Sequence, residues 1–199
     1  GVDAIPAGNA VLFLQKAKRK IRELAYNFDS DGYVAPDLTI LNDTVTKSGV
    51  NQMIFQQEPD SIIWCVRDDG VLAGLTYQRS ENVVAWHRHI FGGSFGSGNS
   101  VCESAASISG TLTEDELWVI VKRTINGATK RYVECFSDFD FDETTATDFK
   151  FLDSHLNYSG SATTTLSGLS HLEGQTVSIL ADGSVHANKV VSSGAITLD

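Results

Sequence analysis

The sequence predicts an all-β protein of stacked, propeller-like sheets, and an internal repeat is the main reason. A block of about fifty residues occurs three times in the first 136 positions, and each copy contains an apolar run with one aromatic residue. These aromatic residues are Phe13, Trp64 and Trp118, so the copies are offset by 51 and 54 residues. Repeats of this length that hold several short strands are typical of β-propeller blades, which must stack to bury their apolar faces.

Each apolar run is followed by a second strand candidate with its own aromatic residue. This second aromatic residue comes 13 residues after the first in two copies of the block and 14 residues after it in the third. Residues around it alternate between apolar and polar, which indicates a strand with one buried face. We predict equivalent structural roles at the repeat positions Phe13, Trp64, Trp118, Tyr26, Tyr77 and Tyr132. The first three are expected to lie on strands and to be mostly buried.

Turns and further strands complete each block. The dipeptides Asp69-Gly70 and Asn126-Gly127 predict exposed hairpin tips, because such pairs tolerate the positive φ of tight turns. Less apolar strand candidates, Val50–Phe55 and Ser100–Ser104, open the second and third blocks, and Val83–Ile90 closes the second. The sequence therefore predicts about three repeats of four strands each.

Helix is scarce in the predicted structure. Only Pro36–Lys47 offers room for a short helical turn, and its β-branched residues weaken that interpretation. The glycine-rich segment Gly92–Gly98 lacks the strand–loop–helix setting of a phosphate-binding loop. We therefore interpret it as a plain loop.

An acidic, threonine-rich run marks the expected domain boundary. We predict a propeller-like repeat region over residues 1–136, a linker over 137–148 and a small β-sandwich or barrel-like module over 149–199, which this chain is expected to cut short. The acidic part, Ser137–Glu143, also raises a calcium hypothesis, because hard cations prefer carboxylate oxygens, but it lacks the spacing of an EF-hand loop.

Composition excludes several classes of protein. The net charge of −10 argues against a surface that grips nucleic acid, since such affinity comes mainly from cations that neutralise phosphates. The one basic run, Lys16–Arg22, is interpreted as a solvated turn, with contact to a polyanion as the alternative. No apolar stretch reaches the length that spans a bilayer. Cys65, Cys102 and Cys135 have no metal-binding spacing.

Few residues are candidates for chemistry. His87 and His89 point to one side of a strand and are weak metal candidates, because a catalytic zinc needs a third protein ligand. Trp86, beside them, is the one aromatic residue that we expect to contact a ligand. No nucleophile, cofactor loop or metal motif has the context that catalysis requires. We predict a non-enzymatic protein without a cofactor.

Several strings resemble tail proteins of bacteriophages and prophages. They are Gln57–Gly70, Leu75-Thr-Tyr77, Val84–Arg88 and Glu116–Gly127, and Arg22–Tyr26 and Tyr33–Leu38 fit the same pattern. The resemblance is to tail-tube or nozzle (tubular protein B-like) proteins of short-tailed phages. It covers roughly residues 9–136 and extends through Leu166–Val177.

The resemblance implies a structural subunit of the nozzle through which DNA leaves the virion, assembled in the bacterial cytoplasm. Its partners are then other tail subunits, as a homo-oligomeric ring in the full-length protein and as adaptor or fibre proteins. DNA passes without specific binding, which suits an acidic wall. We expect this chain, as a piece of that protein, to be monomeric or weakly dimeric. A host-glycan-binding tail module and a tail-associated hydrolase are the alternatives.

Overall fold

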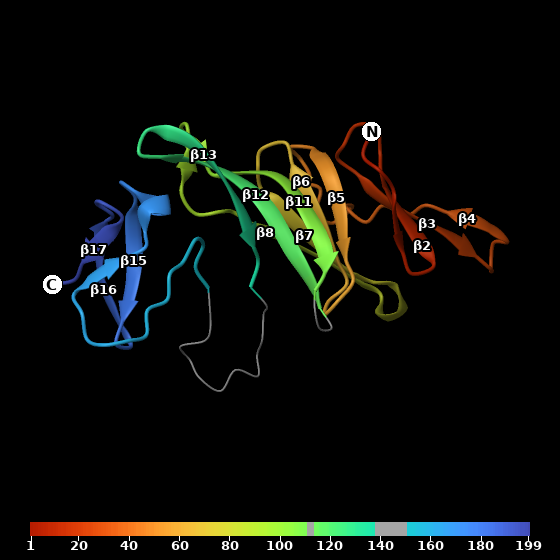
Figure 1. Cartoon of the computed structure of the whole chain (residues 1–199). Helices are drawn as coiled ribbons and strands as arrows, with labels where there is room; N and C mark the ends of the chain where they lie inside the picture. The colour runs from red at the N-terminus through yellow and green to blue at the C-terminus, as the bar shows by residue number, and fades with distance from the viewer. Residues whose placement is uncertain (111–113, 138–150) are drawn as a thin grey trace.

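The protein is all-β. The computed structural model describes residues 1–110, 114–137 and 151–199, and it consists of several small antiparallel sheets without a closed barrel (Figure 1). Within these residues the helical segments are two short 3-10 turns, Arg79–Glu81 and Ser170–Leu172. No helix in this part of the chain is long and apolar enough to cross a membrane. The segment 36–47 forms a series of turns and not a helix.

Three antiparallel sheets follow one another along the chain. The first sheet has the order β1–β2–β3–β4, with strands Ile5–Ala7, Ala10–Leu14, Ile21–Asn27 and Gly32–Val34. The middle sheet has the order β5–β6–β7–β8, with strands Val50–Gln56, Ile62–Arg67, Leu72–Gln78 and Val83–His89. The third sheet has the order β11–β12–β13, with strands Val101–Ser109, Asp115–Ile125 and Ala128–Cys135. A small hairpin, β9 (Ser94–Phe95) and β10 (Gly98–Asn99), precedes it.

The first and middle sheets enclose one apolar cluster. Leu12 and Ile21 of the first sheet are fully buried in it together with Ile63, Cys65 and Leu75 of the middle sheet. The middle and third sheets enclose a second cluster, which contains Trp64, Val66 and Leu72 on one side and Leu117, Val119 and Val121 on the other. Figure 1 shows the three sheets following one another across the molecule.

The middle sheet is therefore buried on both faces. Successive residues of a strand point to opposite faces, so β6 needs apolar side chains at every position. Its sequence, Ile62-Ile-Trp-Cys-Val66, supplies them without interruption. Ile63 and Cys65 contact the first sheet, whereas Trp64 and Val66 contact the third. A sheet covered on one side needs only every second residue to be apolar, and β12 buries Leu117, Val119 and Val121 in this way.

The predicted repeat holds only in part. The first two sheets have four strands each, as expected, but the third has three among the described residues. Phe13, Trp64 and Trp118 all lie on strands, yet only Trp64 is buried, at 5% exposure, while the other two are half-buried on outer faces. Phe13 aligns with Trp64 in sequence, but the two side chains face opposite ways. A shift of one residue reverses the face of a strand, which explains the error.

The two predicted hairpin tips also differ. Asn126 and Gly127 both have positive φ and are exposed, as the sequence predicts. At the other tip only Gly70 has positive φ, and it is buried. A Cβ atom at Gly70 would lie 2.8 Å from the backbone of Val101, and the Gly70 carbonyl accepts a hydrogen bond from the Cys102 amide. This turn packs against the third sheet, so the prediction of an exposed tip was wrong for Gly70, whereas Asp69 is exposed as predicted.

The last part of the chain forms two two-stranded sheets. One pairs β14 (Thr165–Ser167) with β17 (Ala195–Thr197), and the other pairs β15 (Thr176–Ala181) with β16 (Ser184–Val190). Their own small core contains Leu169, Ile179, Val191 and Ile196. Most of the predicted linker, and most of the acidic run of the calcium hypothesis, lie outside the described residues. The division into a repeat region, a linker and a final module stays a prediction.

Because the middle sheet is buried on both faces, truncating its core side chains should lower the stability of the fold. Trp64→Ala removes a buried aromatic side chain and should lower the free energy of unfolding by about 3–5 kcal/mol. Trp118→Ala, at the aligned position on an outer face, should cost clearly less. Chemical denaturation of both variants measures the difference, and equal losses would contradict the burial that the structure assigns to them.

Candidate functional site

The residue group with the most unusual chemistry lies where β8 faces the third sheet. Cross-strand pairing places Trp64, Gly74 and His87 in one row across β6, β7 and β8. The glycine in the centre has no side chain, so the two rings on either side meet above it. Their centroids are 5.4 Å apart in an edge-to-face arrangement. This geometry is the favourable one for aromatic pairs.

Gly74 is required by this contact and not by its backbone conformation. Its φ lies outside the positive region that favours glycine. A Cβ atom at this position would lie 2.1 Å from Cε1 of His87, well inside any tolerable contact. The imidazole therefore occupies the space of the missing side chain, and other rings hold it in that place.

His87 and His89 are hydrogen-bonded to each other. Nδ1 of His87 and Nε2 of His89 are 3.0 Å apart, so one of these nitrogens carries the proton and the other accepts it. Burial lowers the pKa of His87 below its usual value of 6.5. Burial also lowers the pKa of His89, with a further lowering from His87 and an opposing, raising effect from Asp153. Burial therefore disfavours the charged form of both imidazoles.

Aromatic side chains surround the imidazole pair. His89 lies 5.3 Å from the Trp64 ring and 5.6 Å from the Phe136 ring, measured between centroids. Phe136 in turn contacts Trp64 and Phe91, and all three belong to the second apolar cluster. The pair therefore lies at the edge of that cluster and contacts both the middle sheet and the segment that follows β13.

A buried arginine lies near the same edge of the second cluster. Arg123, only 2% exposed, forms a two-pronged ion pair with Glu134, and its Nε donates to the carbonyl of Gly92. The Ser100 hydroxyl donates to the same carbonyl, and the Gly92 amide donates to Asp153. The loop after β8 is thus fixed to the third sheet and to the segment that leads into the final module. Burying this charge is tolerable because each guanidinium nitrogen involved has a partner.

Polar side chains also join the middle and third sheets. The Gln52 amide donates to the Ala105 carbonyl and accepts from the Ala105 amide, both on β11. Gln56 donates to the Asp115 carbonyl and accepts from the indole N–H of Trp64. These bonds satisfy buried polar groups on both sheets and fix the position of one sheet on the other.

The geometry does not favour a metal site at the histidine pair. A metal needs the nitrogen lone pairs to converge on one point, whereas these two nitrogens share a proton directly. The described residues contain no group of three or more His, Cys, Asp or Glu side chains that is arranged to hold a metal ion. The prediction that both imidazoles share one face of a strand is confirmed.

Trp86 does not stand out as an open platform. It lies on the opposite face of β8, half-buried against the first cluster, and its indole N–H donates to the carbonyl of Leu38 at 3.0 Å. Of the remaining repeat positions, Tyr77 is buried, Tyr26 is exposed, and Tyr132 donates its hydroxyl to the carbonyl of His171. The last bond connects the third sheet to the final module.

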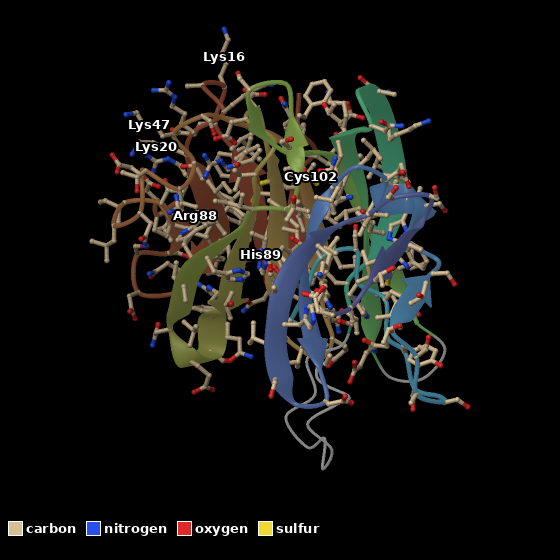
Figure 2. The ribbon with its side chains drawn as sticks, turned by 90° about the vertical axis from the view of Figure 1, so that its left-hand side faces the viewer. Lys16, Lys20, Lys47, Arg88, His89 and Cys102 are labelled. Atoms are coloured by element: carbon tan, nitrogen blue, oxygen red, sulfur yellow. The ribbon has the colours of Figure 1, made fainter. Side chains whose placement is uncertain are left out.

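Two thiols and the basic run lie apart from this group. Burial raises the pKa of the Cys65 thiol to about 12 and that of Cys102 to about 11, which makes both poor nucleophiles. Figure 2 shows Lys16, Lys20 and Lys47 along one edge of the molecule, away from His89. Lys20 forms an ion pair with Asp37 there.

Sequence reasoning missed four members of the group. Arg123 follows the third apolar run, next to Lys122, and its charged side chain gives no sign in the sequence that it is buried. Phe136 and Asp153 lie on either side of the predicted linker, residues 137–148, and no local pattern indicates that both approach the loop after β8. Gly74 offered a weak signal, since glycine inside a strand often marks a close approach of another group.

Comparison with known proteins adds no assignment, because the chain matches no protein-family model and shows no significant similarity to a curated protein.

The contact between Gly74 and the His87 ring can be tested by substitution. Gly74→Ala should destabilise the fold by about 1–3 kcal/mol, because the new methyl group overlaps the His87 ring. In a His87→Ala background the same change should cost much less, since the ring is gone. A double-mutant cycle by chemical denaturation measures this coupling. Additive effects of the two substitutions would contradict the packing described here.

The imidazole pair predicts a pH dependence of stability. Both groups have a lowered pKa in the folded chain, so the unfolded chain takes up protons first as the pH falls. The stabilisation is complete above about pH 6.5 and decreases below it. We expect His87→Gln with His89→Gln to flatten the unfolding free energy between pH 5 and pH 7, approximate limits set by the ordinary histidine pKa.

The matched control is His155→Gln, which changes an exposed histidine of the same chain. It should keep the pH dependence of the unsubstituted protein. If the double variant keeps that dependence as well, the buried pair is not its source.

Proposed function

We propose that this protein is a non-enzymatic structural component of a phage or prophage tail, a part of the nozzle through which DNA exits. One observation carries the proposal: successive blocks of about fifty residues form small antiparallel sheets that stack on one another. Such stacking is how propeller-like bodies are built. The strings that resemble nozzle proteins lie on the same strands, as in Ile62–Arg67 of β6 and Asp115–Ile125 of β12.

The charge of the chain agrees with this role. A net charge of −10 disfavours adhesion of DNA, which suits a wall past which DNA has to slide. The partners in this proposal are other tail subunits, as a homo-oligomeric ring in the full-length protein and as adaptor or fibre proteins. Its location is the virion, after assembly in the bacterial cytoplasm.

The placement of the candidate residues favours a structural role over the alternatives. A glycan-binding site built on Trp86 needs that ring to be open to water, whereas Trp86 is half-buried and donates its indole N–H to the carbonyl of Leu38. A tail-associated hydrolase needs an activated group, whereas the imidazole pair is half-buried against aromatic rings and Cys65 is fully buried. Each of these side chains packs between sheets.

The proposal is tested on purified particles from the host that carries the gene. Mass spectrometry should find peptides of this chain, such as Asp68–Arg79, at the level of a minor structural protein. Antibodies against the chain should label one end of the tail in electron micrographs. A host cytosolic protein of similar abundance is the control for contamination. If the peptides are missing from particles that contain the other tail proteins, the proposal fails.

A further inference from the structure

The hairpin of β3 and β4 exposes three aromatic rings at one end of the molecule (Figure 1). Tyr33 is 75% exposed, Phe28 is 88% exposed, and Tyr26, which pairs with Tyr33 across the hairpin, is 38% exposed. None of these rings belongs to an apolar cluster of the described part of the chain. Grouped apolar side chains that no core requires are a common sign of a binding surface.

The three rings are arranged at right angles and not as a flat stack. The Tyr26 ring makes one edge-to-face contact with Phe28, at 5.0 Å and 85°, and another with Tyr33, at 5.6 Å and 78°. The Tyr26 hydroxyl donates to Oδ1 of Asp31, which holds this ring at the centre of the group. Two perpendicular rings form a corner in which a small group can touch two π faces at once. Because Phe28 and Tyr33 are mostly exposed, their faces are open to water.

The charge around the rings is negative. Residues 25–34 include Asp29 and Asp31 but no lysine or arginine. Asp29 is exposed, and among the described residues it has no hydrogen-bond or ion-pair partner. The cation on the same face of β3 is Arg22, which lies at the opposite end of the strand and donates to the carbonyl of Ala35. Aromatic faces are electron-rich as well, so the rings and the carboxylates together favour a cationic ligand.

Hydrogen bonds within the hairpin indicate which kind of cation fits. One carboxylate oxygen of Asp31 accepts from Tyr26, and the side-chain carbonyl of Asn27 accepts from the Ser30 amide. A guanidinium, a primary ammonium group or a sugar needs several hydrogen-bonding partners in place of water. A quaternary ammonium group has no N–H to satisfy and is held by π faces and nearby negative charge alone. The hairpin therefore suits a quaternary ammonium group best.

We propose that the corner formed by Tyr26, Phe28 and Tyr33 binds a quaternary ammonium group of the choline type. The ring faces contact its methyl groups, while the carboxylates of Asp29 and Asp31 attract its charge. Two sources share this chemistry, namely the headgroup of a choline lipid and a soluble choline compound. The inference concerns this hairpin alone and does not depend on a location in the virion.

Choline itself is the probe, and proton NMR at neutral pH is the measurement. Ring currents shift the signal of methyl groups that lie over aromatic faces upfield, so this shift should grow with protein concentration and saturate. We expect a dissociation constant on the order of 1 mM, because exposed cation–π contacts are individually weak. The neutral isostere of choline, in which a tert-butyl group replaces trimethylammonium, should bind at least about tenfold more weakly.

Substitutions in the hairpin should weaken choline binding without unfolding the protein. Tyr33→Leu and Phe28→Leu each remove one exposed ring and should weaken binding about fivefold. Asp29→Asn with Asp31→Asn removes the negative charge and should weaken it about threefold. The matched control is Tyr158→Leu, which removes an exposed tyrosine outside the hairpin and should bind choline like the unsubstituted protein. Circular dichroism and thermal unfolding establish that each variant is folded.

Vesicles distinguish the two sources of the ligand. Co-sedimentation with phosphatidylcholine vesicles, but not with phosphatidylglycerol vesicles, would assign the site to a lipid headgroup. Binding of free choline without binding of vesicles would assign it to a soluble compound. Either result supports the site.

Four results would overturn the proposal. They are the absence of a choline shift, equal binding of the neutral isostere, preference for a sugar such as methyl glucoside over choline, and equal loss of binding in the control variant. The second would show a merely apolar surface, and the last would place binding outside the hairpin. None of these results bears on the presence of the protein in purified particles, so failure here and failure of the proposed function are separate.

Discussion

Burial of the middle sheet on both faces is the constraint on which the rest of the structure depends. A strand with two buried faces has to be apolar throughout, and β6 is the strand that meets this demand. Its odd-numbered residues contact the first sheet, and its even-numbered residues contact the third. Removing the first or the third sheet would expose one face of β6 to water. The three sheets are therefore stabilised together, although hydrogen bonding makes each a separate unit.

Close packing between the middle and third sheets explains the unusual groups found there. Gly74 leaves room for the His87 ring, and that ring in turn completes the wall of the second cluster. One hydrogen bond pairs a nitrogen of each imidazole, which lowers the cost of placing these rings next to aromatic side chains. Gln52 and Gln56 supply directional bonds in an otherwise apolar contact. Apolar burial gives this contact its stability, while the polar side chains fix how one sheet lies on the other.

The loop after β8 connects this contact to the end of the chain. The Gly92 amide donates a hydrogen bond to Asp153, and the Gly92 carbonyl accepts hydrogen bonds from Arg123 and Ser100. Glu134 pairs with Arg123 and accepts from the Ser154 hydroxyl. Together with the bond from Tyr132 to His171, these contacts hold the final module against the third sheet through polar groups. Such a contact differs from the apolar clusters that join the first three sheets.

The sequence by itself determined the all-β class, the middle sheet and its β-strands, and the tight turn at Asn126-Gly127, because alternation and turn residues are local properties. The shared face of His87 and His89 followed from the same period of two. Sequence did not determine which face of Phe13 would be covered, since a shift of one residue in the alignment reverses it. Only the tertiary structure decided that Gly70 is buried, that Arg123 is enclosed and that Gly74 accommodates an imidazole. Each depends on a neighbouring strand or sheet whose position is set by packing between segments far apart in the chain.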